Sequence, residues 1–169
     1  MYLIIIKIIN LFNNTYWKLY YSQYHEKYKL DKTFKFKGPH IVFYGDGNII
    51  AGKNSYIGGF STVQATENHS VKIGNNVRIS HNVRIYTSST DPDIDLSQNE
   101  KKTIKGNVTI NDYAWIGANV FIKEGINIGA NSVIGANSVV TKDIEPYGIY
   151  GGIPAKLIRY KSSFKNSKI

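Results

Sequence analysis

Residues 110–144 read INDYAWIGANVFIKEGINIGANSVIGANSVVTKDI, and an aliphatic residue returns in this stretch at every sixth position. These residues are Ile110, Ile116, Ile122, Ile128, Ile134 and Val140. A short fixed period is typical of a solenoid, in which each repeat buries its apolar face only by stacking on the next one. The period therefore predicts an all-β fold built from stacked coils.

Each six-residue unit predicts one short strand followed by one corner. Gly, Asn and Asp occupy the corners, because these residues tolerate a positive φ: Gly117, Gly129, Gly135, Asn131, Asn137 and Asp143. Three units close one triangular coil, so residues eighteen positions apart should stack as parallel strands. We therefore expect Ile116 under Ile134 and Ala118 under Ala136.

The same phase continues upstream to about Gly45, with one slip, and it is interrupted between residues 91 and 103. This predicts an N-terminal helical segment at 1–38, a β-helix at 39–145 and a C-terminal cap with a basic tail at 146–169. The interruption is polar and lacks the phase, so we expect a loop ejected from one corner. Loops on a rigid scaffold often carry function.

Composition narrows the chemistry. The 169 residues correspond to one domain, the formal charge is +9, and cysteine is absent. Absence of Cys excludes a disulfide framework, a thiolate metal site and a Cys nucleophile. The positive charge suits a phosphate-bearing ligand or an anionic surface. No RNA-binding signature is present, so we expect no nucleic-acid partner.

Both ends of the chain depart from the repeat. Residues 2–12 are apolar but shorter than the ~20 residues that span a bilayer, and no signal-peptide cleavage site follows them. An aromatic stripe at helical spacing comes next: Trp17, Tyr20, Tyr21, Tyr24 and Tyr28. This helix either packs on the end coil or a neighbouring subunit, or it contacts a membrane surface. Residues 155–160 should form a capping strand or short helix, because an open sheet edge must be covered.

Two segments, residues 113–143 and the motif GGIPAKLIR at 151–159, closely resemble the hexapeptide-repeat acyltransferases. The likeness is to the branch that contains maltose, galactoside and polysaccharide O-acetyltransferases, and it covers residues 39–160. It implies a left-handed parallel β-helix and a homotrimer. It also implies that acetyl-coenzyme A, the acyl donor, lies in a groove between neighbouring subunits.

The resemblance assigns roles to individual residues. Ala118 and Ala136 would meet the pantetheine arm through their backbone amides, although both also fit as ordinary corner residues. Thr141 and Lys142 would line the cofactor groove, and cations from the second motif would lie near the phosphates: Lys156 and Arg159. Cations suit phosphates in charge-assisted hydrogen bonds.

The residues expected at the acceptor site match the family less well than those expected at the cofactor site. Trp115 matches a Trp beside the acceptor in many family members, or it covers the outer face, and we expect Asp93 of the loop at the acceptor as well. Thr90 stands where the family has its catalytic His, and Thr cannot act as a general base at neutral pH.

Three possibilities remain for proton removal. Another His serves, with His81 ranked first and His69 second, oriented by a carboxylate from a neighbour's loop (Asp91, Asp93 or Asp95). Alternatively, a loop Asp acts on an amine acceptor, or the chain binds without catalysing.

We expect a cytoplasmic, trimeric acetyltransferase that moves acetyl directly from acetyl-coenzyme A to a sugar hydroxyl, without metal, in surface-polysaccharide or glycoconjugate synthesis. If the N-terminal segment contacts lipid, the protein works at the inner face of the membrane. The alternatives are N-acetylation of a nucleotide-linked amino sugar and a non-catalytic trimeric scaffold. A γ-class carbonic anhydrase is disfavoured, because its His-x4-His spacing is missing.

Overall fold

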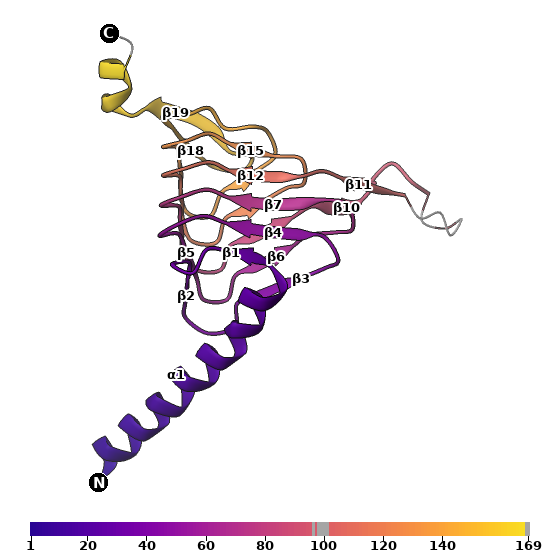
Figure 1. Ribbon diagram of the computed structural model, residues 1–169. Coiled ribbons are helices and arrows are strands. Elements are labelled where there is room, and N and C mark those ends of the chain that lie inside the picture. Colours follow the sequence, from indigo (N-terminus) through magenta and orange to yellow (C-terminus); the bar gives the residue numbers. More distant parts are fainter. Residues whose placement is uncertain (96, 98–101, 168–169) are drawn as a thin grey trace.

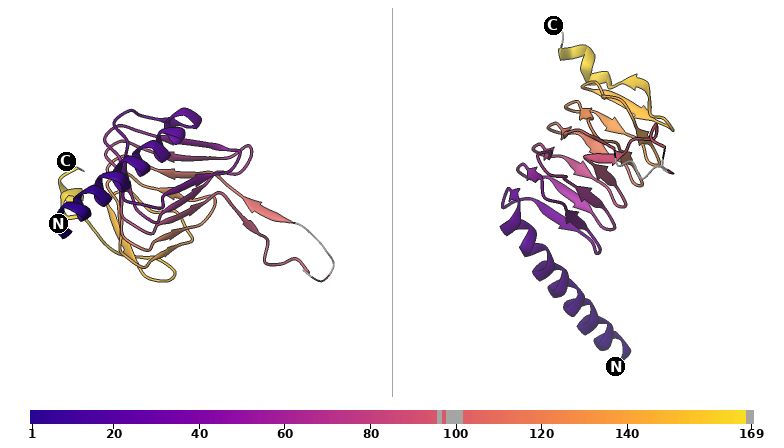
Figure 2. Two further views of the ribbon diagram at one scale, coloured as in Figure 1. Left: turned by 90° about the horizontal axis from the view of Figure 1, so that it is seen from below. Right: turned by 90° about the vertical axis from the view of Figure 1, so that its right-hand side faces the viewer.

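The protein is a stack of triangular coils, with a long helix at its lower end and a hairpin projecting from its side (Figures 1 and 2). The computed structural model describes residues 1–95, 97 and 102–167. The middle of the expected loop and the last two residues of the expected basic tail lie outside the described residues.

Three parallel sheets form the sides of the stack. Sheet A contains β1 (Lys29–Leu30), β4 (Asn48–Ala51), β7 (Ser70–Ile73), β12 (Val108–Ile110) and β15 (Asn127–Ile128). Sheet B contains β2 (Lys35–Lys37), β5 (Tyr56–Gly58), β8 (Arg78–Ile79), β13 (Trp115–Ile116), β16 (Val133–Ile134), β18 (Gly148–Gly151) and β19 (Lys156–Tyr160). Sheet C contains β3 (Val42–Tyr44), β6 (Thr62–Gln64), β9 (Arg84–Tyr86), β14 (Phe121–Ile122) and β17 (Val139–Val140).

The predicted stacking at a separation of eighteen residues is confirmed in the upper coils. Ile116 pairs with Ile134, and Ile122 pairs with Val140. These side chains fill the interior of the solenoid and are fully buried. Each interior side chain therefore depends for its packing on the equivalent side chains of the coil above and the coil below.

The solenoid extends beyond both ends of the expected range of 39–145. At the lower end, β1 pairs with β4 and β2 pairs with β5. At the upper end, β18 pairs in parallel with β16, and the antiparallel strand β19 then caps β18, as the need to cover the edge predicted. Both outer coils depart from the eighteen-residue spacing: Phe36 pairs with Ile57, twenty-one residues away, and Ile134 pairs with Tyr150, sixteen residues away, so the six-residue phase is lost.

The three corners of the stack are called AB, BC and CA, after the sheets that each of them joins in chain order. At the BC corner, and at the AB corner above the first coil, one non-glycine residue of each coil has a positive φ. In the BC corner these residues are His40, Phe60, Asn82, Asn119 and Asn137. The amide of Asn119 links the column, because it accepts from Asn82 Nδ2 at 2.8 Å and donates to Asn137 Oδ1 at 2.9 Å. The corner residues thus combine a left-handed backbone with a side-chain ladder.

The aromatic stripe lies on helix α1 (Tyr2–Lys27), and its C-terminal part closes the lower end of the core. Tyr21 stacks on Phe36 with ring centroids 4.6 Å apart, and Tyr24 stacks on Phe43 at 5.2 Å. The expectation of a helix packed on the end coil is therefore confirmed. Among the described residues, no helix combines the length and apolarity needed to cross a membrane.

The expected loop leaves the CA corner as a hairpin stem. Strands β10 (Ser88–Thr90) and β11 (Thr103–Lys105) pair in antiparallel fashion, and the hairpin points away from the solenoid (Figure 2). At the upper end, the chain finishes in a short 3-10 helix, η2 (Ser162–Ser167), after β19.

Candidate active site

The BC corner carries a column of small residues with available backbone donors. The amides of Asn119 and Asn137 donate to the carbonyls of His81 and Ala118 in the coil below. By contrast, the N–H groups of His81, Ala118 and Ala136 donate to no acceptor among the described residues. Exposed, unpaired amides on a corner with small side chains can receive hydrogen bonds from a ligand chain.

A shallow pocket of about 500 Å³ opens beside this corner. It is lined by His40, Phe60, Thr62, His81, Asn82, Arg84 and Asn119. The side chains offer flat rings, amides, a hydroxyl and a guanidinium, and none of the described carboxylates lines the pocket. Such a mixture suits a polar ligand with hydroxyl groups or a negative charge.

His81 is an exposed member of this pocket, and its position is set by close packing below it. Gly58 lies directly underneath, where a Cβ atom would come within 2.6 Å of the His81 backbone nitrogen. Only glycine allows this approach. The His81 imidazole can act as a base, but within one chain the pocket supplies no carboxylate to orient it.

His40 is a site residue that sequence analysis overlooked, because it precedes the regular repeat. The structure places it in the BC corner of the first coil, with a φ of 56°. Its ring stacks on Phe60 at 5.2 Å and meets the edge of Trp17 at 4.8 Å. The signal was present in the sequence: His40 precedes the buried Ile41, just as Asn82 precedes the buried Val83.

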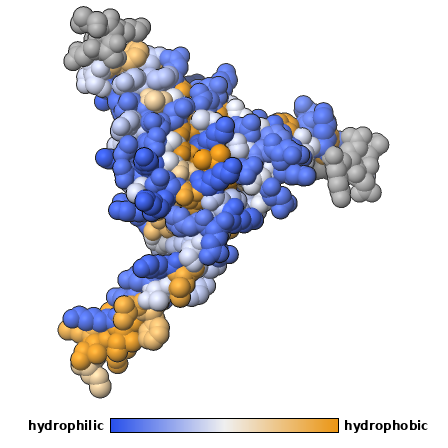
Figure 3. All heavy atoms as spheres, viewed as in Figure 1, coloured by the Kyte–Doolittle hydropathy of each residue, from blue (hydrophilic) through white to orange (hydrophobic). Residues whose placement is uncertain are grey.

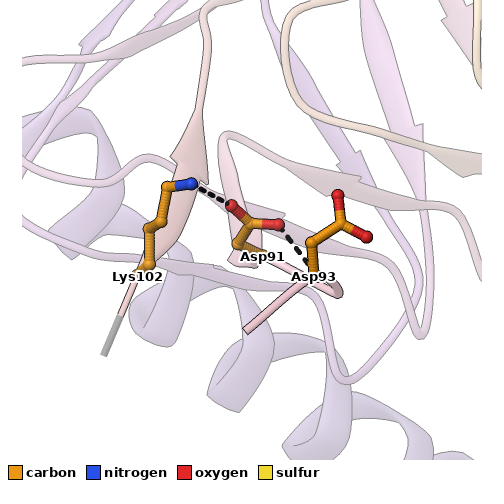
Figure 4. Close-up of polar contacts among 3 residues, drawn as sticks. All are labelled: Asp91, Asp93 and Lys102. Carbon is orange, nitrogen blue, oxygen red and sulfur yellow. Dashed lines mark hydrogen bonds and ion pairs between the residues drawn. The ribbon is translucent and has the colours of Figure 1, made fainter. Parts of the chain in front are cut away.

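The loop root at the CA corner holds the acidic residues. The Asp91 carboxylate pairs with Lys102 Nζ at 2.8 Å through one oxygen and accepts from the Asp93 backbone N–H at 3.0 Å through the other (Figure 4). The Lys102 ammonium, helped by that N–H, lowers the pKa of Asp91 below its ordinary value. Asp91 is therefore an ionised structural group, which ties the two ends of the loop together.

The other two loop carboxylates differ from each other. Asp95 accepts from the backbone N–H and the hydroxyl of Ser97 at 2.9 and 2.7 Å. The Asp93 carboxylate points away from Asp91 and Lys102, and it has no hydrogen-bond or ion-pair partner among the described residues (Figure 4). Of the three candidates, Asp93 is thus the one that remains available to a ligand or to another chain.

His69 lies in the CA corner, in the coil directly below the loop root. Its Nδ1 contacts the Glu67 carbonyl oxygen at 2.9 Å. When Nδ1 donates that bond, the neutral ring keeps an unprotonated Nε2. His69 is therefore better oriented within one chain than His81, although it lies at a different corner from the pocket.

The predicted cofactor residues occupy more than one corner of a single chain. Lys156 pairs with Gly151 above the Ala136 corner, whereas Arg159 lies opposite Ile149, further along β19. Thr141 and Lys142 follow β17, at the CA corner. One chain therefore brings Ala118, Ala136 and Lys156 to the same corner and separates them from the other cations.

The two predicted acceptor residues are also apart within one chain. Trp115 projects from β13 on the outer face of sheet B and is 51% exposed, whereas Asp93 belongs to the hairpin at the CA corner. Among the described residues, no group of three or more His, Asp or Glu side chains could hold a metal ion.

Two family models match the coils. Residues 107–142 match the bacterial transferase hexapeptide model, which describes six repeats. Residues 48–87 match the hexapeptide repeat of succinyl-transferase. The two matches lie on either side of the ejected loop.

Relatives span most of this chain. Galactoside O-acetyltransferase of Escherichia coli is 37% identical over 72% of this chain and 58% of its own length. A hexapeptide-repeat acetyltransferase of Vibrio cholerae, solved with acetyl-coenzyme A, is 30% identical with a TM-score of 0.61 over 76% of this chain and 70% of that chain. A maltose O-acetyltransferase of Clostridium difficile is 34% identical with a TM-score of 0.59 over 76% of this chain and 71% of that chain.

The chain thus spans little more than half the length of its galactoside relative and about seven tenths of the two solved structures. The expected left-handed parallel β-helix is confirmed by the solved relatives together with the stacked coils described above. The six-residue repeat, the stacked coils and the similarity to these relatives together show that the chain belongs to the hexapeptide-repeat acetyltransferase family.

Proposed function

We propose that the protein transfers acetyl from acetyl-coenzyme A to a sugar hydroxyl. The observation that carries the proposal is the BC corner, where unpaired backbone amides lie beside a pocket of rings, amides and imidazoles. Support comes from relatives named as galactoside and maltose O-acetyltransferases and from a relative solved with acetyl-coenzyme A.

The acyl donor would lie along the BC corner. The small side chains of Ala118 and Ala136 leave their amides accessible to the carbonyl and amide groups of a pantetheine arm. Lys156, above Ala136, is then suited to the phosphates. Thr141, Lys142 and Arg159 would reach the same groove along its length or from an adjacent subunit of a homotrimer.

The acceptor would occupy the pocket beside His81. Stacked rings such as His40 and Phe60 suit the apolar face of a sugar, and the amides of Asn82 and Asn119 suit its hydroxyl groups. In a trimer the neighbour's hairpin would close this pocket, bringing Asp93 to His81. Trp115 stays a candidate acceptor residue at the outer face.

The reaction would be a direct transfer. The sugar oxygen attacks the thioester carbonyl carbon, and its proton passes to His81 Nε2 or Nδ1. The carbon–sulfur bond then breaks, and the proton leaves with the coenzyme A thiol. Positioning and backbone amides aimed at the tetrahedral oxyanion would supply the rest of the catalysis.

A second candidate, N-acetylation of an amino sugar linked to a nucleotide, is favoured by one observation. Thr90 replaces the family base, and the adjacent Asp91 is held ionised by Lys102 rather than facing the pocket. An uncharged amine attacks a thioester with less help from a base. In both cases the setting we propose is the synthesis of surface polysaccharide or glycoconjugate on the cytoplasmic side of the membrane.

The test is a panel of sugars and nucleotide sugars incubated with acetyl-coenzyme A, read by release of thiol. A hydroxyl acceptor should yield an ester that mild base removes, whereas an amine acceptor should yield an amide that survives. No thiol release with any acceptor, from a protein that binds acetyl-coenzyme A, would instead favour the non-catalytic scaffold.

The donor site has its own test. Lys156→Ala combined with Arg159→Ala should raise the KM for acetyl-coenzyme A ~10-fold, equivalent to ~1.4 kcal/mol. The matched control is Lys53→Ala with Lys72→Ala, which removes two exposed cations from lower coils and should leave this KM unchanged. Equal effects in the two variants would contradict the placement of the phosphates.

A further inference from the structure

The N-terminal half of α1 carries an apolar face that the rest of the chain does not cover. Its members recur at intervals of three and four residues, as one face of a helix requires: Ile5, Ile8, Ile9, Phe12, Tyr16 and Leu19. Between 48% and 70% of each side chain is exposed. This outer face, together with Tyr2, Leu3 and Ile4, forms the apolar region at the end of the projecting helix (Figure 3).

The outer face is distinct from the side of α1 that closes the solenoid. That side consists of Trp17, Tyr21 and Tyr24, which pack on the first coil together with Tyr28 just after the helix. The stripe that holds the core is thus aromatic and lies in the second half of the helix. The outer face is mainly aliphatic and begins earlier, so core packing does not explain it.

The remaining side of the helix carries polar and cationic residues beside one exposed aliphatic residue, Leu11. Lys7, Asn10, Asn14 and Lys18 recur at the same spacing, and residues 1–24 contain no Asp or Glu. Next to this side runs a groove of about 1030 Å³ between α1 and the first coil, and its lining includes Lys18, Lys35 and Lys37. The lower end of the molecule therefore combines exposed aliphatic side chains with lysines.

We propose that α1 lies on the surface of a membrane that contains anionic lipid, with its outer face immersed among the acyl chains. An amphipathic helix with Lys on the polar side and aliphatic residues opposite is suited to this interface. Eighteen residues, Tyr2 to Leu19, give a contact ~27 Å long. Tyr16 then lies near the end of the immersed part, where aromatic residues favour the headgroup region.

Charge argues for lipid rather than for a second copy of the chain. Helices that pair with copies of themselves commonly set acidic side chains against basic ones beside the apolar seam. Residues 1–24 offer only Lys7 and Lys18, so paired copies would bring lysines together without acidic partners. An anionic headgroup satisfies the same lysines, at roughly 1 kcal/mol for each cation near the surface.

The test is cosedimentation of the full chain with vesicles of equal parts phosphatidylcholine and phosphatidylglycerol, and with vesicles of phosphatidylcholine alone. Ile9→Gln with Phe12→Gln should lower the partition coefficient at least ~10-fold, because two immersed apolar side chains are lost. Asn10→Gln with Asn14→Gln is the matched control on the polar side and should bind like the wild type. Lys7→Gln with Lys18→Gln should lower the preference for the anionic vesicles ~10-fold or more.

Two results would overturn the proposal. One is unchanged vesicle binding by Ile9→Gln with Phe12→Gln in a protein with a native circular dichroism spectrum. The other is a wild type that does not bind vesicles; if this variant also dissociates an oligomer in light scattering, a second copy covers the outer face. Acetyl transfer to a soluble acceptor should be the same in the variant, so this test stands apart from the proposed activity.

Discussion

The BC and CA corners of the solenoid are built on the same three-sheet frame, yet they carry opposite chemistry. The BC corner has no insertion, and it holds imidazoles, Arg84 and an asparagine ladder. The CA corner ejects the hairpin and holds the loop carboxylates. A coil separates its corners by the length of a strand, so His40 and His81 do not meet the loop carboxylates of their own chain, whereas His69 lies at the CA corner below the loop root.

This separation has a consequence for the proposed chemistry. A site that joins His81 to Asp93 has to be made from two chains, because the Asp93 hairpin projects outward from its own solenoid (Figure 2). In the homotrimer proposed above, the hairpin of each chain would reach the BC corner of the next. The following experiments test whether the two corners act together in this way.

The largest effect is expected at His81. His81→Ala should lower kcat by ~10² to 10⁴ with cofactor binding intact, as loss of a general base does. The Asp93→Ala variant should also have a lower kcat than the wild type. Unfolding and reassembling the two variants together should restore activity in about a quarter of the sites, because only mixed interfaces contain both residues. A mixture no more active than its components would show that His81 and Asp93 do not act at a shared site. Full activity in His81→Ala with loss of activity in His69→Ala would identify His69, at the CA corner, as the base.

Gly58→Ala tests the BC corner through its backbone. The added Cβ would lie 2.6 Å from the His81 nitrogen and 2.7 Å from the Ser80 carbonyl carbon, so the corner must shift. We expect a loss of ~1–3 kcal/mol in stability and, because alignment matters, a fall in kcat of ~10-fold or more.

Gly74→Ala is the matched control at the AB corner. Its Cβ would lie 2.8 Å from the Asp112 nitrogen, which should cost similar stability without moving His81. Thermal melts and kcat of the folded fraction separate the two effects. Equal losses of kcat in both variants would show that any strain in the coils, not the position of His81, lowers the rate.

The asparagine ladder should give a smaller effect. Asn119 has a φ of 58° and two side-chain hydrogen bonds, to Asn82 and Asn137. Asn119→Ala should lose the ladder and also strain the backbone, whereas Asn119→Gly loses only the ladder. The Ala variant should therefore be less stable than the Gly variant by ~1 kcal/mol in thermal melts. A Gly variant as unstable as the Ala variant would show that the side-chain bonds dominate.

The smallest effect is expected at the root of the loop. Since Lys102 and the Asp93 N–H lower the pKa of Asp91 in the folded protein, the contribution of Asp91 is complete above its ordinary pKa and is lost as the pH falls through the folded value. Asp91→Asn should thus melt below the wild type at neutral pH, and the gap should close in acid. A gap that stays constant with pH would mean that the carboxylate charge does not hold the CA corner.

The repeat could be predicted from the sequence because each interior side chain rests on its equivalent one coil away. Ile116 and Ile134 are three periods apart in the sequence, and for that reason they occupy the same position in adjacent coils and pair with each other. The capping strand and the helix on the end coil were also predictable, since an open solenoid must cover both ends. Local pattern and tertiary contact are nearly the same information in such a fold.

Positions where the spacing changes were harder to predict. Strands β1 and β2 fall inside the expected helical segment of 1–38, because the turns of the first coil break the period, and His40 precedes the regular repeat. The availability of Asp93, in contrast to Asp91, depends on the ion pair across the hairpin stem, and a linear sequence does not show which carboxylate Lys102 reaches.

By itself the sequence determined the stacked coils, the ejected loop, the missing family base and the family to which the chain belongs, because these follow from spacing and motif. Only the tertiary structure decided which corner each group occupies, that His40 shares a pocket with His81, and that these two imidazoles lie a strand away from the loop acids. The physical reason is that a corner is defined by the register of three sheets, which short-range spacing predicts only where every coil has the same length.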